Sequence, residues 1–290
     1  MTTEAGSVGL PTDSHSHSEW SWDAPTGSME GSCARAVELG LPAIAFTEHV
    51  DVTRWVIPPS LRARMHVHGH RVAADGRYDP PPLDLEGYRA SLERCRERFP
   101  SLRILSGVEL GEPHWFPDEV DRLLASGAFD RVLGSQHSVE RDGRPWIVAG
   151  LEADLVPPDL TPEDVVRAHL AETLDLIAGC DRFEVLAHID YAVRKWPAGP
   201  AAFPAADFEE EFRSVLRALA GSDRALELNT VIPLDDRILR WWVEEGGRTL
   251  TFGSDAHQPD AVGQGFAAAA AMAEAAGFRP DRHPHAPWRR

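Results

Sequence analysis

Short apolar runs alternate along the chain with longer segments of helical periodicity. A strand buried in a parallel sheet is apolar on both faces and only a few residues long, and the runs have this character. A weaker first strand is expected to end at Asp13–His17. The other predicted strands are Ala43–His49, Arg103–Leu110, Arg131–His137, Glu184–Asp190, Ala225–Thr230 and Thr249–His257.

The segments between these runs carry recognisable helix ends. Gly40 follows one segment, as glycine often does at a helix C-terminus, and Thr161 precedes Pro162, which suits the first helical position. The predicted helices are Met29–Leu39, Leu85–Phe99, Pro117–Ala125, Pro162–Ala178, Ala206–Leu219, Asp235–Glu245 and Pro259–Ala276. Repeated strand–helix units predict an α/β fold with a parallel barrel, and an open doubly wound sheet is the alternative.

One stretch interrupts this alternation. Between about Val50 and Asp84 no period is evident, and prolines punctuate the segment. A connection this long inside a compact domain usually has a function, and we interpret it as a lid-like insertion over the barrel mouth. Residues 1–9 and 279–290 are expected to be flexible termini, so that the barrel domain spans residues 10–278.

Composition narrows the class of protein. The chain has 290 residues, 43% of them hydrophobic, and a formal charge of −17. The acidic balance, with a pI near 5.1, argues against extended nucleic acid and anionic membranes as partners. No apolar run fits a membrane span or a signal peptide. Cys33, Cys95 and Cys180 form no CxxC pair, which is typical of reduced thiols. We expect a cytoplasmic monomer or small homo-oligomer.

Metal-ligand residue types recur where the predicted strands end. In a parallel barrel the carboxyl ends of the strands share one face, and active sites are built there. The residues at these ends are His15, His17, His49, Glu109, His137, His188, Asp255 and His257. Each alone has an ordinary interpretation as a polar strand cap or, for Asp255, a helix cap. Together they predict a metal centre of imidazole and carboxylate ligands, which suit zinc, manganese and iron.

Six segments of the chain resemble motifs of the polymerase-and-histidinol-phosphatase (PHP) superfamily, and they occur in the same order. They are DSHSHSEWSWDAP, AFTEHVD, SGVELG, GSQHS, AHIDY and GSDAH. The pattern is most similar to the monomeric histidinol-phosphate phosphatase branch, from about Pro11 to Ala275. The resemblance implies a distorted (β/α)7 TIM-like barrel with three divalent ions (Zn, Mn or Fe). It adds Asp23, so the implied ligands are His15, His17, Asp23, His49, Glu109, His137, His188, Asp255 and His257. Among them, Glu109, Asp255 and His257 are expected to act in catalysis.

The resemblance also implies an activity. It is hydrolysis of a small anionic phosphate ester, with L-histidinol phosphate as the first candidate, by metal-bound hydroxide at a trinuclear centre. The candidate substrate-binding residues are Arg194, Lys195, Asn229 and Arg237. After Asn229 the segment VIPLDDR departs from the family's usual pattern, so substrate recognition is less firmly implied than metal binding.

Other functions stay open at this point. A PHP-family phosphatase or phosphodiesterase could act on a sugar or nucleotide phosphate. A metal-dependent C–N hydrolase of the amidohydrolase type also starts with His-x-His, but many of these bridge two metals with a strand-end lysine. The only lysine here, Lys195, is not at that position, so Glu109 would have to serve. Glu48 is expected to orient His49 rather than to bind metal.

Overall fold

A curled sheet forms the centre of the protein, described by a computed structural model over residues 9–57, 59, 62, 72–148 and 159–290. Within these residues the sheet has eight strands in the order β1-β2-β5-β6-β9-β10-β11-β12. Their bounds are Asp13–Ser16, Ala43–Asp51, Arg103–Gly111, Arg131–Ser135, Val185–Leu186, Ala225–Asn229, Thr249–Gly253 and Trp288–Arg289. Neighbouring strands run parallel from β1 to β11, and β12 is antiparallel to β11.

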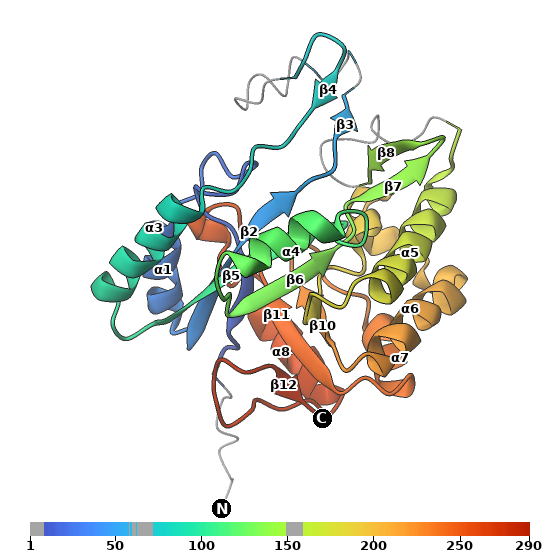
Figure 1. The fold of residues 1–290 in the computed structure, drawn as a ribbon. Helices are drawn as coiled ribbons and strands as arrows, with labels where there is room; N and C mark the ends of the chain where they lie inside the picture. Colours follow the sequence, from blue (N-terminus) through green and yellow to red (C-terminus); the bar gives the residue numbers. More distant parts are fainter. Residues whose placement is uncertain (1–8, 58, 60–61, 63–71, 149–158) are drawn as a thin grey trace, which may run out of the picture.

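The sheet is curled (Figure 1), and its first strand meets the chain that leaves its last parallel strand. Ser16 forms a parallel bridge with Ala256. The backbone N–H of His17 donates to the carbonyl of Ala256, and that of Asp255 donates to the carbonyl of His15, both at 2.8 Å. These bonds confirm the predicted barrel, and the open doubly wound sheet is wrong. The barrel is distorted because β9 has only two residues in the ladder.

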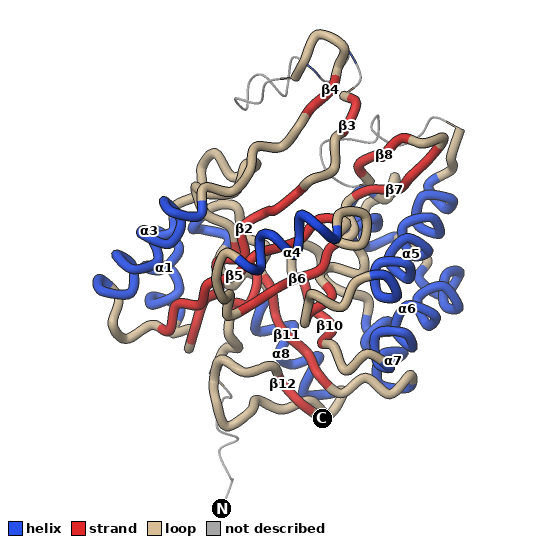
Figure 2. Tube along the Cα trace, viewed as in Figure 1, coloured by secondary structure: helices blue, strands red, loops and turns tan. Residues whose placement is uncertain are grey.

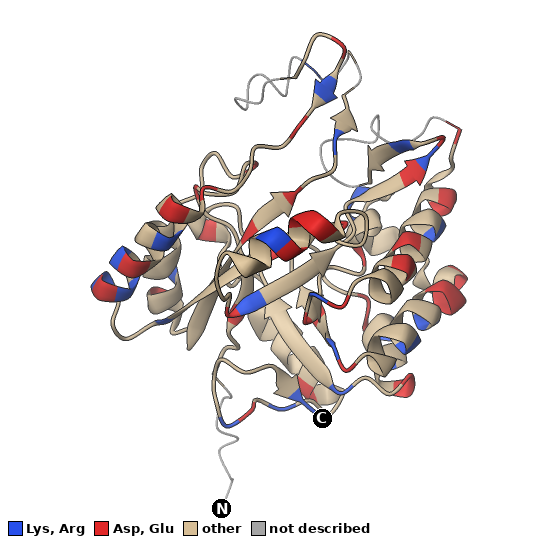
Figure 3. Ribbon diagram, viewed as in Figure 1, with Lys and Arg blue, Asp and Glu red and all other residues tan. Residues whose placement is uncertain are grey.

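Helices flank the sheet on both sides (Figure 2). The helices α1 and α3 lie on one flank, and α5, α6 and α7 lie on the other. The bounds are α1 Met29–Leu39, α3 Leu85–Arg98, α4 Pro117–Ala125, α5 Pro162–Gly179, α6 Glu209–Gly221, α7 Asp236–Glu244 and α8 Phe266–Ala275. None of the helices in the described ranges is long and apolar enough to cross a membrane. Charged residues are frequent on these helices, while the strands carry few (Figure 3).

Local chemistry explains where the helices begin and end. Gly40 ends α1 in a left-handed conformation, with φ of 70°. Thr161 and Asp164 form a capping box at the start of α5. The last predicted helix differs from the expectation, because Pro259–Ala261 forms a separate 3-10 turn. Gly265, with φ of 70°, stands between that turn and α8, and a left-handed residue cannot continue a helix.

Alternate residues on the strands face two different environments. On β10, Leu226 and Leu228 join the hydrophobic core between sheet and helices. The residue between them, Glu227, is 1% exposed and faces the barrel interior, where it contacts His15. Period-two alternation therefore directs acidic side chains inward from strands that look apolar in sequence.

Two antiparallel pairs lie beyond the ends of the parallel strands (Figure 1). One is β3 (Trp55–Val56) with β4 (Arg77–Tyr78), and the other is β7 (Ser138–Arg141) with β8 (Arg144–Ile147). The first pair belongs to the predicted lid, whose role stays a prediction. The lid histidines at positions 66, 68 and 70 and the N-terminal residues 1–8 lie outside the described residues.

The C-terminal segment is more ordered than we predicted. Instead of a flexible tail from Arg279, Trp288 and Arg289 pair with Leu250 and Thr249 of β11. The Trp288 side chain is 3% exposed, and its ring lies edge-on to Phe252 with the ring centroids 4.8 Å apart. The proline- and arginine-rich composition favours a disordered segment, but burial of one large aromatic ring stabilises the ordered strand.

The buried tryptophan predicts a stabilising role for this segment. Trp288→Ala should lower the free energy of unfolding by about 3–5 kcal/mol, the usual cost of removing a buried aromatic ring. Urea unfolding followed by circular dichroism measures this difference. Arg289→Ala, on the exposed side of the same strand, is the matched control and should change stability by less than about 0.5 kcal/mol. Equal midpoints for Trp288→Ala and the parent chain would show that the segment is dispensable for folding.

Candidate functional site

The predicted ligands converge at the carboxyl ends of the parallel strands. Eight of the nine fall into overlapping groups in which the potential ligand atoms lie within 4.8 Å of one another. The groups are His17–His49–His257, His15–His17–Glu109, His15–His188–Asp255 and His49–Glu109–His137. The ninth, Asp23, places Oδ2 3.3 Å from Nε2 of His49 and 3.1 Å from Nε2 of His257.

Glu109, fully buried, lies at the centre of the cluster. Its Oε2 atom is within 3.4 Å of a nitrogen of three histidines, and its Oε1 atom is within 3.1 Å of a nitrogen of two others. The first three are His15, His17 and His49, and the other two are His137 and His188. The hydroxyl of Ser135 also donates to Oε1 at 2.6 Å. A carboxylate with both oxygens among imidazoles has the geometry of a bridging metal ligand.

The direction of the ring nitrogens tests whether this cluster fits a metal. Nε2 of His15 and Nε2 of His17 face each other at 3.1 Å, and both lie close to Oδ1 of Asp255. Two nitrogen lone pairs at this distance repel unless a proton or a metal cation lies between them. The imidazole and carboxylate donors, with no cysteine among them, are suited to a divalent transition metal with open positions.

Electrostatics in the cluster favours cations. Burial alone would lower the pKa of His15, but Glu227, Glu109 and Asp255 raise that pKa well above its usual value. Burial would likewise raise the pKa of Glu109, yet the surrounding histidines hold it well below its usual range. His17 behaves differently, because burial and two neighbouring histidines lower its pKa to about 3. A neutral imidazole is the form that binds metal.

Three buried carboxylates lie behind the predicted ligands, and no pattern in the sequence indicated them. Oε1 of Glu227 lies 2.8 Å from Nδ1 of His15, and its Oε2 accepts the backbone N–H of His188 at 2.9 Å. Asp51 contacts Nδ1 of His137 at 3.2 Å. Glu112 accepts the backbone N–H of His137 at 2.7 Å. Each contacts a predicted ligand from behind, as outer partners do in metal sites.

Glu48 has the supporting role that we expected, although it acts through serines. Its carboxylate accepts hydrogen bonds from the hydroxyls of Ser18 and Ser21, both at 2.5 Å. Ser21 Oγ in turn accepts the backbone N–H of His49 and lies 3.0 Å from Nδ1 of His17. Glu48 therefore orders Ser18 and Ser21, and Ser21 contacts the predicted ligands His17 and His49.

Small residues and strained backbone make room for the cluster. A Cβ atom at Gly253 would overlap the carboxylate of Glu227 and the Cβ of His15. His188 and Asp255, both at strand ends, have positive φ values of 20° and 51°. Such conformations are costly for residues other than glycine and concentrate at functional sites.

The four candidate substrate-binding residues separate into two pairs. Arg194 donates to Oδ2 of Asp255 at 2.6 Å and to Oδ1 of Asn229 at 3.0 Å, so the structure brings Arg194 and Asn229 to the cluster. Lys195 is exposed, because successive side chains on the 3-10 helix Tyr191–Lys195 point about 120° apart. Arg237 forms an ion pair with Asp235 at 2.6 Å. Within the described residues, neither Lys195 nor Arg237 contacts the cluster, and their substrate-binding role stays a prediction.

Comparison with known proteins gives consistent matches. The model of the PHP domain family matches residues 13–231. The histidinol-phosphatase of Lactococcus lactis is 26% identical over 253 residues, covering 84% of this chain and 83% of that protein. A probable histidinol-phosphatase of Thermotoga maritima is 30% identical over 153 residues, 49% of this chain and 61% of that protein.

Solved structures agree on the fold. The crystal structure of the Lactococcus lactis histidinol phosphate phosphatase, complexed with zinc, L-histidinol and phosphate, has a TM-score of 0.74 at 24% identity. The match covers 93% of this chain and 95% of that one. A structure from Listeria monocytogenes described as a putative histidinol phosphatase has a TM-score of 0.70 at 19% identity, covering 89% and 99% of the two chains.

The contact between Glu227 and His15 generates a prediction about metal affinity. Glu227→Gln keeps the shape of the side chain but removes the negative charge behind the imidazole. We expect metal affinity to fall by ~10–100-fold, the usual effect of losing such an outer partner. Competition with a fluorescent chelator measures the affinity. Glu245→Gln, at the end of α7, is the matched control and should bind metal as the parent does. Unchanged affinity in Glu227→Gln would contradict the supporting role.

Proposed function

Because the chain belongs to the PHP domain family and is a phosphoric monoester hydrolase, we propose that it hydrolyses L-histidinol phosphate to L-histidinol and phosphate at a centre of three divalent ions. The observation that carries this proposal is the convergence of the nine predicted ligands in one cluster, with five histidines around the buried carboxylate of Glu109. The curated relatives named histidinol-phosphatase support the substrate. So does the similar Lactococcus lactis structure, which contains zinc, L-histidinol and phosphate.

Overlap between the ligand groups supports more than one ion. Glu109 and His15 each belong to two of the groups, and His17 and His49 also belong to two. We therefore assign Glu109 as a bridging ligand. Asp255, whose Oδ1 lies within 3.6 Å of Nε2 of both His15 and His17, is assigned as a second shared carboxylate. Bound ions would supply activated water and would neutralise charge on the phosphoryl oxygens. The proposed ligands are His15, His17, Asp23, His49, Glu109, His137, His188, Asp255 and His257.

Arg194 is the side chain best placed to bind the phosphate group. Its side chain is 14% exposed, and its guanidinium lies 4.9 Å from the centre of the Tyr191 ring while donating to Asp255 and Asn229. Its Nε atom is buried and has no hydrogen-bond partner among the described residues. A guanidinium held in place on one side and unsatisfied on another can orient phosphoryl oxygens through charge-assisted hydrogen bonds.

His257 is the proposed ligand most open to solvent. Its side chain is 34% exposed, compared with 27% for Asp23 and 8% for His49. Nδ1 of His257 lies 2.9 Å from the backbone carbonyl of Asp255, and this contact fixes the ring. We assign His257 and Asp255 to the side of the centre that the ester approaches, where they orient the reacting group.

The C–N hydrolase alternative receives no support from the position of the lysine. Lys195 is exposed on its 3-10 helix, and the central bridging position belongs to Glu109. The alternative substrate class is a phosphate ester of a sugar or nucleotide, because the proposed contacts of Arg194 and the ions are with the phosphate group that all these esters share.

Substrate preference tests the proposal directly. The metal-loaded protein should hydrolyse L-histidinol phosphate with a higher kcat/KM than a panel of sugar, nucleotide and amino-alcohol phosphates, measured by phosphate release. The panel contains its own controls, because all members share the phosphate and differ in the alcohol. A member hydrolysed faster than L-histidinol phosphate would reassign the substrate, and turnover of none would contradict phosphatase activity.

Adjacent residues on one 3-10 helix test the phosphate-binding role. Arg194→Gln should lower kcat/KM by ~10–100-fold, the equivalent of losing one charge-assisted hydrogen bond of about 1.5–3 kcal/mol. Lys195→Gln, which also loses a positive charge, should stay within about twofold of the parent, because an exposed charge contributes little. Steady-state kinetics measures both variants. Equal decreases of kcat/KM in the two variants would show that the positive charge of this helix supports activity and that the specific contacts of Arg194 do not.

A further inference from the structure

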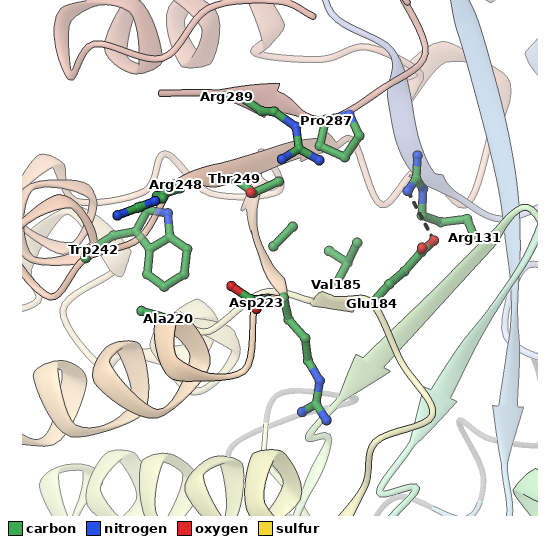
Figure 4. Close-up of a pocket in the computed structure, with 13 residues that line it drawn as sticks. Arg131, Glu184, Val185, Ala220, Asp223, Trp242, Arg248, Thr249, Pro287 and Arg289 are labelled. Atoms are coloured by element: carbon green, nitrogen blue, oxygen red, sulfur yellow. Dashed lines mark hydrogen bonds and ion pairs between the residues drawn. The ribbon is translucent and has the colours of Figure 1, made fainter.

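A second pocket lies at the opposite end of the barrel from the metal ligands. It has a volume of about 710 Å³ and lies where the parallel strands begin (Figure 4). Arg131, Val185, Ala225 and Thr249 are the first residues of β6, β9, β10 and β11, and all four line it. Arg289 of β12 completes the wall. We call this space the base pocket. None of the proposed metal ligands lines it.

Positive charge gathers around the base pocket in a chain that is otherwise strongly negative. Four arginines line it, against two acidic residues, whereas the whole chain has a formal charge of −17. The arginines are Arg131, Arg224, Arg248 and Arg289, and the acidic residues are Glu184 and Asp223. A local excess of cations in a concave site attracts anions even when the protein surface repels them.

Two buried donors in the wall lack acceptors. The Arg131 side chain is 7% exposed, and it forms an ion pair with Glu184 at 3.1 Å, yet its Nε atom has no hydrogen-bond partner within the described chain. The indole nitrogen of Trp242, a fully buried residue, also has none there. Buried donors are normally satisfied, because an unmet one costs free energy. Both groups are donors, so a ligand that offers acceptor oxygens in the pocket would satisfy them.

The four arginines are not equally engaged. Arg224 is fixed, because it donates to the carbonyls of Ile177 and Cys180 and stacks 4.0 Å from the ring centre of Phe183. Among the described residues, the Arg289 side chain has only a long ion pair with Asp281, at 3.8 Å. The exposed side chain of Arg248 makes no ion pair or hydrogen bond with any described residue. In Figure 4, Arg248 lies beside Trp242 on one side of the pocket and Arg131 pairs with Glu184 on the other.

We propose that the base pocket binds a small polyanion, a molecule with more than one phosphate or carboxylate group. A volume of about 710 Å³ falls in the range of small-molecule sites and exceeds what one inorganic phosphate fills. Arginine binds such groups through paired, charge-assisted hydrogen bonds. Glu184 competes with the anion for Arg131, and Asp223 lies in the same wall, so both acids limit the affinity. This binding is separate from the hydrolytic reaction proposed above.

The test uses inorganic pyrophosphate as the probe. Isothermal titration calorimetry on the metal-loaded protein measures its binding. The variant carries Arg248→Gln and Arg289→Gln. The matched control carries Arg217→Gln and Arg240→Gln, which remove two comparably exposed charges from α6 and α7. Pyrophosphate binding at the metal centre is common to all three proteins and cancels in the comparison. The parent and the control should bind pyrophosphate at the base pocket with the same affinity. This affinity should be at least ~tenfold weaker in the pocket variant. Identical isotherms for the parent and the pocket variant would overturn the proposal.

Glu184→Gln supplies an independent test of opposite sign. It frees the guanidinium of Arg131 and removes a negative charge from the wall, so pyrophosphate should bind several-fold more tightly than to the parent. If the pocket were only a structural gap, this substitution would leave the isotherm unchanged. Unchanged or weaker binding in Glu184→Gln contradicts the proposal, and circular dichroism checks that each variant is folded.

Discussion

A buried carboxylate surrounded by imidazoles is the constraint on which the rest of the site depends. Glu109 has no exposed surface, and five histidines approach its two oxygens. An uncompensated charge in such a place costs far more free energy than ordinary contacts recover. The cluster therefore requires cations, and metal ions meet the requirement while leaving the imidazoles neutral, as metal ligands must be.

The barrel satisfies this constraint by assembling one layer of side chains from every part of the chain. His15 comes from the first parallel strand and Asp255 from the segment after the last, yet barrel closure joins their backbones directly. Glu227 and Asp51 then hold individual rings from behind. The same strands begin at the base pocket, so one sheet separates two charged environments at its opposite ends.

Much of this arrangement could be predicted from sequence, for identifiable reasons. Parallel strands align their carboxyl ends, so the positions of His49 near the end of β2 and of His188 just beyond β9 suffice to place both beside Glu109. Helix ends followed from Gly40 and Thr161, whose caps are local. Glu227 was missed because an acidic residue between two leucines shows no partner in sequence. Arg194 and Lys195 are equivalent in sequence, but on the 3-10 helix the Arg194 side chain points toward the cluster and the Lys195 side chain points to solvent. The strand at Trp288 depends on a long-range contact with Phe252, which no local pattern indicates.

The metal content of the protein tests the central claim most directly. The protein is purified without chelators, and its zinc, manganese and iron are counted per chain by inductively coupled plasma mass spectrometry. The convergence of the nine proposed ligands, Glu109 among them, predicts three divalent ions per chain. Fewer than two ions per folded chain, even after incubation with excess metal, would contradict the account.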